Sequence, residues 1–553
     1  MNDKALAALG EVFKSELNVS ENWELYAENL FPDNEHKVIT VLFTADGEKG
    51  KISVNYKGTD ISPYDNSSYR KYLYRRGSPN GGDITPTTKF SGIDSAETLK
   101  SKKVDTILNN VLRRIVDLAD NNSEDETAER EIFIRITDLW RNNYEKINTD
   151  IHNIYSSLSK DEKFKCGITI GLVRNGELLR NDKLNLLKKA LILDGTEGMS
   201  VFTGVRSEGE NRQCSVCNEI KPRLHGFAAP FKYFTVDKKG YISNYFNLKL
   251  AWKNYPVCED CAQNLYLGSR MLKENLFFRF YRRNYMAVPR LLTGNEAMLG
   301  SLVNFLKELK SNLKEAVSEE DIVMEYIASS ENYFFLDLVF IDYDAKSQTM
   351  KIKSHVEEVL PSRFRTLFKE AREAVNDHIT FTNFLAFEEF LQGSKKQAEI
   401  YKFRFRFGYL LQFFDDEDYS PIQNAFYGNK FREKNLFERF MNFYRDNYSL
   451  KLQGKPYHSL RKTVIEAIGV ILYLSELGLL EFNKINYEVK MENKTENLKK
   501  ESSFDLERLK EFIEANPQFF DRKYKIGLFT LGILIKLVMN IQNANLGSTP
   551  FER

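Results

Sequence analysis

The sequence contains few histidines and none of the common catalytic motifs. Only six histidines occur in 553 residues, and none belongs to an H-E-x-x-H or H-N-H arrangement that would build a metal nuclease site. The G-x-x-x-x-G-K-[ST] loop of nucleotide hydrolases, the G-x-S-x-G elbow and a tandem GGDD motif are also absent. These absences argue against an enzyme.

Long apolar runs and an excess of one charge are missing as well. The most apolar helical stretches, residues 468–480 and 526–539, are shorter than the roughly 18 residues that a membrane span needs, so we expect core helices. The N-terminus shows no basic segment followed by an apolar run, and no secretion signal is predicted. With 79 basic and 78 acidic side chains, any contact with nucleic acid must come from local patches.

The length and composition predict several globular domains. A chain of 553 residues is too long for one core, and roughly 150 residues per domain gives two to four domains. Hydrophobic residues make up 42% and charged residues 28%, which is typical of a soluble protein. The 41 Phe and 28 Tyr residues suit large cores, protein interfaces or base stacking.

Four of the five cysteines form two C-x-x-C pairs. The first pair is Cys214 and Cys217, the second is Cys258 and Cys261, and forty residues separate the pairs. Two such pairs supply the four thiolates of a tetrahedral zinc ion and leave no open position for water. We therefore predict one structural Zn²⁺ in a cytoplasmic protein; two disulfides or a thioredoxin-like redox pair are the alternatives.

The residues around these pairs predict the local structure. Asn218 follows the first pair and Pro256 precedes the second, which predicts tight turns that aim backbone N–H groups at the sulfurs. Between the pairs, FKYFTVDKKGYISNYF is typical of a β-hairpin. Cys166, the fifth cysteine, lies in a predicted strand and is expected to be a buried thiol.

Two segments are candidates for binding nucleic acid. The loop at residues 67–90, SSYRKYLYRRGSPNGGDITPTTKF, combines glycines, prolines and basic side chains that suit phosphate groups, although an ordinary solvated turn is the alternative. The segment at residues 265–290 predicts a basic helix that binds either a nucleic-acid backbone or acidic protein partners. The candidate residues are Arg75, Arg76, Ser78, Asn80, Lys89, Arg279, Arg282 and Arg283.

The hydrophobic period changes along the chain. Alternating patterns predict β-hairpins near residues 38–58, 165–179 and 333–359, whereas helical patterns dominate beyond residue 360. The predicted fold is α+β, with mixed α/β N-terminal and zinc-knuckle regions followed by a mainly helical C-terminal bundle. The expected domains are residues 1–160, 161–355 and 356–553.

Several motifs together resemble a known family. They are YLYRRGSPNGGDITPT, the knuckles CSVC and NYPVCEDC with KYFTVDKKGY between them, the following LYLGSRML, and NIQNANLGSTPFER. In this order they resemble the large subunit of the type I-B CRISPR Cascade, in the zinc-knuckle branch of the Cas-eight family. The resemblance spans most of the chain.

The resemblance implies a non-catalytic subunit of an antiviral surveillance complex. Such a subunit contacts the 5′ end of the guide RNA and the Cascade backbone, reads the protospacer-adjacent motif in target double-stranded DNA, and starts strand separation. The C-terminal region resembles a small-subunit-like bundle, and a helicase-nuclease recruited afterwards cuts the DNA. By position, the resemblance assigns nucleic-acid contacts to the loop residues Arg75, Arg76, Ser78, Asn80 and Lys89.

Two other functions stay open from the residues alone. Asp342 and Asp344 form a D-x-D pair, the minimum for a metal-dependent nuclease or a polymerase-like effector subunit, although one pair without a third carboxylate is weak. A zinc-stapled scaffold that binds only protein is the third alternative. Relatives are expected to continue into further helices beyond STPFER, and an internal start such as Met441 could yield a separate small subunit.

Overall fold

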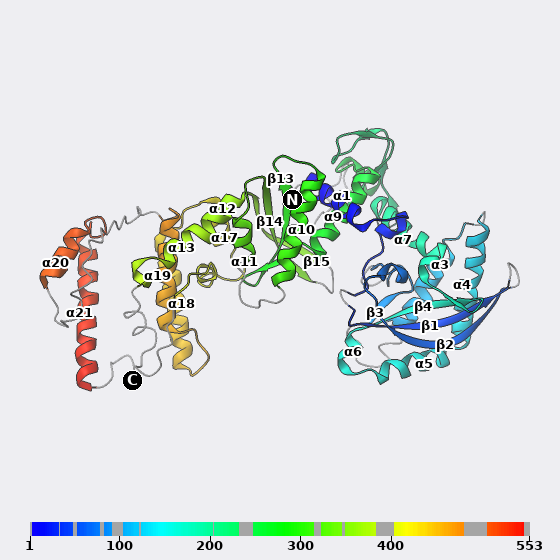
Figure 1. The fold of residues 1–553 in the computed structure, drawn as a ribbon, viewed down its shortest axis with the longest axis horizontal. Helices are drawn as coiled ribbons and strands as arrows, with labels where there is room; N and C mark the ends of the chain where they lie inside the picture. Colours follow the sequence, from blue (N-terminus) through cyan, green and yellow to red (C-terminus); the bar gives the residue numbers. More distant parts are fainter. Residues whose placement is uncertain are drawn as a thin grey trace. The chain divides into compact units, whose positions relative to one another are not determined.

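The computed structural model divides the chain into two compact units (Figure 1). The first comprises Met1–Arg365 with Asp416–Tyr419, and the second comprises Thr366–Asp415 with Ser420–Arg553. The structure describes residues 3–31, 34–47, 52–77, 82–90, 103–120, 123–202, 204–231, 247–313, 322–344, 349–382, 403–480 and 506–546. Within these residues, no helix combines the length and apolar character needed to cross a bilayer.

The first unit contains a mixed sheet near its N-terminus. Its strands are β1 (Lys37–Asp46), β2 (Ser53–Pro63), β3 (Thr88–Phe90), β4 (Cys166–Arg174) and β5 (Glu177–Leu179). The order is β2-β1-β4-β3, with β5 paired to β4, and only the β1–β4 pair is parallel. The predicted hairpins at residues 38–58 and 165–179 are confirmed. Asn175 and Gly176 make the second turn with φ of 52° and 81°, a conformation that suits Asn-Gly.

Helices cover this sheet and extend from it. They are η2 (Tyr69–Tyr72), η4 (Ile107–Val111), α3 (Leu112–Val116), α4 (Glu124–Asn142), α5 (Tyr144–Ser157), α6 (Lys160–Phe164), η5 (Asn181–Lys183) and α7 (Asn185–Ser200). Helix α4 begins where the Ser123 side chain accepts a hydrogen bond from the Glu126 N–H, as an N-cap should. The buried Trp140 of α4 packs against Phe43 of β1, with ring centroids 5.8 Å apart.

A second, antiparallel sheet lies further along the same unit. Its strands are β12 (Phe277–Phe280), β13 (Arg283–Leu291), β14 (Phe334–Asp344) and β15 (Thr349–Val359), paired in that order. Helices α1 (Asp3–Leu17), α9 (Glu259–Glu274) and α10 (Glu296–Leu313) pack on β13, and α11 (Ile322–Ala328) follows α10. Helix α1 buries an apolar face that includes Leu6, Leu9 and Phe13, and the 3-10 turn η1 (Asn22–Leu25) comes after it.

The helix predicted over residues 265–290 is wrong in its second half. Helix α9 ends at Glu274, and β12 and β13 then form a hairpin whose turn is Tyr281-Arg282. Both turn residues have positive φ, 44° and 66°, as a type I′ turn requires. Such a turn favours Asn or Gly, so the Tyr-Arg pair gave no turn signal in the sequence.

Beyond β15 the described chain is helical apart from one isolated bridge, Phe431 to Leu480. The helices are α12 (Pro361–Arg365), η7 (Thr366–Glu370), α13 (Ala371–Asn376), α14 (Ile379–Thr382), α16 (Gly408–Leu411), α17 (Ser420–Tyr427), α18 (Glu433–Leu452), α19 (Leu460–Glu476), α20 (Leu506–Ala515) and α21 (Lys523–Leu546). The predicted α+β fold with a helical C-terminal region is thus confirmed.

Aromatic rings form much of the core of the second unit. Phe405 stacks on Tyr473 of α19 with centroids 4.5 Å apart, and Phe381 stacks on Phe403 at 4.2 Å. The apolar run at 468–480 therefore includes core residues, as expected. The run at 526–539 does not behave as a core helix: Phe529 of α21 stacks on Phe512 of α20, but Leu528 is 64% exposed.

Candidate metal centre and candidate nucleic-acid residues

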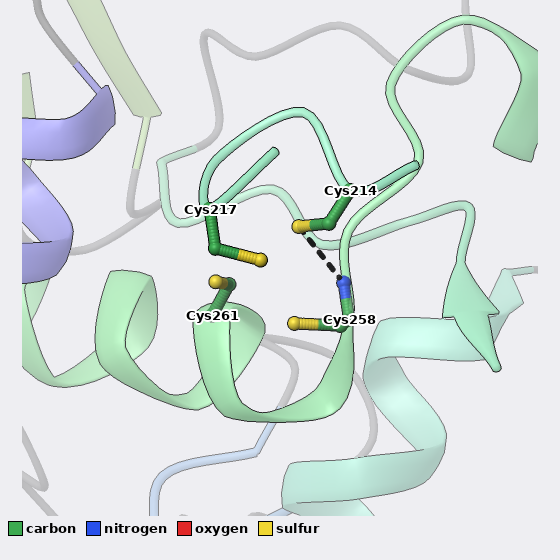
Figure 2. Close-up of side chains that lie close together, drawn as sticks. All are labelled: Cys214, Cys217, Cys258 and Cys261. Atoms are coloured by element: carbon green, nitrogen blue, oxygen red, sulfur yellow. Dashed lines mark hydrogen bonds between the residues drawn. The ribbon is translucent and has the colours of Figure 1, made fainter. Parts of the chain in front are cut away.

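The four paired cysteines converge on one point (Figure 2). Their sulfurs all lie within 4.8 Å of one another; Cys217 is exposed and the other three are buried. A tetrahedral site with metal–sulfur bonds of about 2.3 Å needs sulfurs about 3.8 Å apart. The cluster could therefore hold one metal ion. Among the described residues, no other group of three or more Cys, His, Asp or Glu side chains converges in this way.

The first knuckle is a tight turn between two short strands, β9 (Arg212–Gln213) and β10 (Ile220–Lys221). Asn218 adopts a left-handed backbone with φ of 62° and donates its N–H to the Cys214 carbonyl at 3.0 Å. The Val216 N–H points at Cys214 Sγ at 3.4 Å. This geometry confirms the predicted turn and its N–H···S bond.

The second knuckle places its cysteines at the start of α9. Cys258 is the N-cap residue and Cys261 lies in the first turn, where the helix dipole and free N–H groups favour thiolates. The Cys258 N–H donates to Cys214 Sγ at 3.4 Å, drawn as the dashed line in Figure 2. The Pro256 carbonyl accepts from the Ser215 N–H at 2.8 Å, so the backbone joins the two knuckles.

The thiols of the cluster differ in acidity because their surroundings differ. Burial alone would raise the pKa of Cys214, but backbone N–H groups of Cys258, Cys217 and Val216 lower it to about 7. Burial raises the pKa of Cys258 to about 11 and that of Cys261 further still. Cys214 is thus more readily ionised than Cys258 or Cys261, and a bound cation would stabilise the thiolates of those two residues.

Short secondary-structure elements and polar contacts surround the cysteine cluster. The elements are the strands β6 (Val201–Phe202), β7 (Val205–Arg206), β8 (Glu208–Gly209) and β11 (Leu224–His225), and the 3-10 turn η6 (Leu248–Lys253). The buried His225 pairs its backbone with Val257 and its Nδ1 with the Ser200 hydroxyl at 2.5 Å. Tyr255 donates its hydroxyl to Asp3 of α1 at 2.7 Å. The hairpin expected at residues 231–246 lies, apart from Phe231, outside the described residues.

Arg75 is a buried core residue. Its side chain is almost fully enclosed, Nε donates to Asp194 of α7 at 2.5 Å, and Nη1 donates to the Tyr266 hydroxyl of α9 at 2.7 Å. The guanidinium also lies over the rings of Tyr26 and Tyr266. Although burial alone would lower its pKa, Tyr266 and the Asp194 charge raise it above the usual value. Arg75 therefore ties the loop to two helices.

Arg76 and Lys89 lie at the two ends of the same loop. Arg76 is exposed, and its backbone N–H donates to Glu28 Oε2 at 3.3 Å. Lys89, in β3, is half-buried with its Nζ 5.6 Å from the ring centres of both Phe31 and Tyr74. Ser78 and Asn80 lie outside the described residues. Of the predicted loop contacts that are described, Arg76 and Lys89 thus have accessible charge.

The three candidate arginines beyond α9 lie on the β12–β13 hairpin. Arg279 is exposed on β12. Arg282, in the turn, is 76% exposed and pairs with Asp416 at 3.4 Å. Arg283 is buried, donates Nη2 to the Asp418 carbonyl at 3.3 Å and lies over the Tyr419 ring. An acidic segment, Asp416–Asp418, thus contacts the arginines of this turn.

Two basic residues near the loop were missed from the sequence. Arg114 donates Nη2 to the Asp83 and Ile84 carbonyls at 2.7 and 3.2 Å. Lys103 is half-buried, with its Nζ 3.5 Å from Thr88 Oγ1. Lys103 and Arg114 are eleven residues apart, a spacing that would place them on one face of a regular α-helix, but a π-helical turn at Ile107–Val111 lies between them.

Asp342 and Asp344 lie on β14, and both are exposed. They lie two residues apart at the end of the strand, and no third metal-binding side chain joins them among the described residues. The pair thus supplies only two carboxylates, and a magnesium site in proteins ordinarily needs further ligands.

Comparison with known proteins identifies the family. Among curated proteins, none matches this chain. Three family models of the CRISPR-associated protein TM1802 do match: the N-terminal domain at residues 4–191, the central domain at 211–359 and the C-terminal domain at 411–553. Together they cover most of the chain in sequence order, and the central match contains all four clustered cysteines. The chain therefore belongs to the CRISPR-associated TM1802 family.

Proposed function

We propose that this protein is the large subunit of a type I-B CRISPR Cascade and that it carries a structural zinc ion. The observation that carries the proposal is the ordered match of three domains of one CRISPR-associated family, with the cysteine cluster inside the central domain. In this role the subunit works in the cytoplasm beside the Cascade backbone and small subunits. It contacts the guide RNA 5′ end and reads the protospacer-adjacent motif in target double-stranded DNA.

The proposed zinc ion has a structural role. Four cysteine ligands complete its coordination, so no position remains for a reacting water. Bound there, zinc would hold the Cys214 knuckle against the start of α9, which places the β12–β13 hairpin that follows α9. The metal would hold the two knuckles together. Any contact with nucleic acid would be made by side chains of the protein.

The proposed nucleic-acid contacts come from three exposed basic residues and the half-buried Lys89. Arg76 and Lys89 flank the loop, and Arg279 and Arg282 lie on the hairpin. Arginine can bind a phosphate through two nitrogens or read the edge of guanine, whereas lysine acts as a point charge. We propose no catalytic residue: the subunit reads and opens DNA, and a recruited helicase-nuclease cuts it.

Reconstitution of the complex tests this function. The full chain is assembled with its backbone and small subunits and a guide RNA, and binding is measured to duplexes with and without the motif. We expect selective binding that weakens in Arg76→Ala. Equal binding to both duplexes would contradict motif reading. Magnesium-dependent DNA cleavage by the purified chain that disappears in Asp342→Ala would contradict the non-catalytic role.

A further inference from the structure

A group of basic residues surrounds the base of the loop at residues 76–89, and only part of it was expected from the sequence. The Ile84 N–H donates to the Arg75 carbonyl at 3.0 Å and closes the base. Gly77 then packs so tightly that an added Cβ would lie 1.9 Å from the Gly82 carbonyl oxygen. Just outside this closure are Arg76, on the irregular segment entering the loop, and Lys89, on the strand β3 leaving it. Lys103 joins them through Thr88.

The two lysines lack acidic partners among the described residues. Lys89 contacts aromatic faces, and the hydrogen bond to Thr88 is the polar contact of Lys103. Burial lowers the pKa of both lysines, and the positive charge of Arg76 lowers each further. A half-buried ammonium without a counter-charge is costly, and such sites often bind an external anion.

The nearest carboxylates are already engaged elsewhere. Glu28 accepts hydrogen bonds from the Tyr266 hydroxyl at 3.1 Å and from the Arg76 N–H at 3.3 Å. Asp83 accepts from the Gly77 N–H at 3.2 Å. Both carboxylates act on the lysines only at longer range, and they do not restore the ordinary lysine pKa. Among the described residues, the positive charge at the loop base is therefore only partly neutralised.

We propose that Lys89 and Lys103 hold phosphate groups of a nucleic-acid backbone at the base of this loop. The inference rests on the proposed function, and it adds Lys103 to the interface and assigns both lysines a positioning role. An ammonium group binds phosphate without reading base identity. The site therefore fixes the strand's position on the protein, and the motif is read by other residues.

Binding measured against salt concentration tests the site in the full zinc-loaded chain and in the reconstituted complex. The probe is a fluorescein-labelled single-stranded oligonucleotide of mixed sequence, followed by anisotropy. For Lys89→Gln/Lys103→Gln we expect about tenfold weaker binding, equal for all sequences. The slope of log K against log salt should fall by about 0.7 for each lysine removed.

Matched variants separate charge from structure. Lys89→Arg/Lys103→Arg keeps both charges and should retain most of the affinity. Lys146→Gln removes a lysine that lies over the Tyr56 ring, and it should leave binding unchanged. An unchanged salt slope in the double Gln variant, or failure of the Arg variant to retain binding, would overturn this site.

Two further outcomes are distinguishable. If inorganic phosphate competes with the oligonucleotide at equal phosphate concentration, the site binds free anions, and the nucleic-acid proposal is wrong. If neither the wild-type chain nor the wild-type complex binds any nucleic acid, the proposed function itself fails. Binding by the wild type with an unchanged slope in the double Gln variant would remove only the lysine site.

Discussion

Gly268 of α9 lies directly against the backbone of Leu6 in α1, where an added Cβ would stand 2.0 Å from the Leu6 carbonyl oxygen. One helical turn earlier, Asn264 of α9 faces Gly10 of α1 in the same way, at 1.9 Å. The two helices therefore cross with their backbones in contact. Because α9 begins at the cysteine cluster, this crossing connects the candidate metal centre to the N-terminus.

The crossing predicts that Gly268→Ala destabilises the first unit. The new methyl group meets main-chain atoms that cannot rotate away, so the helices must separate, at a cost of about 1–3 kcal/mol. Differential scanning fluorimetry should show a lower unfolding midpoint. Gly198→Ala in α7 is the matched control, because nothing lies within 4 Å of its Cβ position. That variant should be neutral or gain about 0.5–1 kcal/mol of helix stability.

Metal content is the second prediction. Elemental analysis of the purified chain should give one zinc per chain, and Cys214→Ser should lose it because three thiolates no longer close the site. Chelation of the wild type should lower its unfolding midpoint, since metal binding contributes to folding. Cys166→Ser, which changes a buried thiol in β4, should keep its zinc. A full zinc complement in Cys214→Ser would contradict the four-cysteine assignment.

The adjacent residues Arg75 and Arg76 should behave in opposite ways. Arg75→Ala removes the ion-pair partner of Asp194. We expect the free energy of unfolding to fall by about 2–3 kcal/mol; the loss is limited because Asp194 is partly exposed to solvent. Arg76→Ala should leave the unfolding midpoint unchanged and weaken nucleic-acid binding. Chemical unfolding and anisotropy measured on both variants separate the two effects. Stable Arg75→Ala protein with weakened binding would show that Arg75 contacts nucleic acid directly.

The sequence predicted the local features best. The hairpins at residues 38–58 and 165–179 and the tight turn at the first C-x-x-C pair depend on neighbouring residues, and they formed as expected. Arg75 is different because its partners Asp194 and Tyr266 lie 119 and 191 residues away. A basic side chain in a Gly-rich loop has the same local pattern whether it faces solvent or a distant helix. Tertiary packing decides whether this arginine is buried, and the local sequence pattern carries no information about that packing.

The basic hairpin shows a second limit. Phe277 to Phe280 and the residues after them are aromatic and basic, a composition that fits an amphipathic helix or a strand. The segment forms a strand because β13 pairs with β14, from Asn284 opposite Ile341 to Leu291 opposite Phe334. That partner is about fifty residues distant, so the local period could not identify it.

Cys166 provides a prediction about alkaline pH. Burial raises the pKa of its thiol from 9.0 to about 12, so the folded state keeps the proton where the unfolded state releases it. The thiol's contribution to stability is complete below pH 9 and is lost as the pH rises toward 12. The free energy of unfolding of the wild type should thus fall relative to Cys166→Ala across this range. Parallel pH curves for the two proteins would contradict the shift.

The acidic segment on the basic turn gives the last prediction. Asp416 pairs with Arg282 and Glu417 pairs with Lys353, with both carboxylates well exposed. Exposed pairs contribute about 0–1 kcal/mol each, so phosphates could displace them. We expect Asp416→Asn/Glu417→Gln to bind an oligonucleotide up to about fivefold more tightly at low salt, and the gain should vanish at high salt.

The control for this prediction is Glu131→Gln, which removes the half-buried partner of the exposed Arg135 on α4. It removes one negative charge, at a site distant in sequence from the hairpin. If the affinity gain arises at the turn, Glu131→Gln leaves binding unchanged, and adding Arg282→Ala abolishes the gain of the double variant. An equal gain for each charge removed, in Glu131→Gln and in the double variant, would mean that only net charge matters, because long-range attraction does not depend on which carboxylate is removed. The Arg282 turn would then have no specific part in binding.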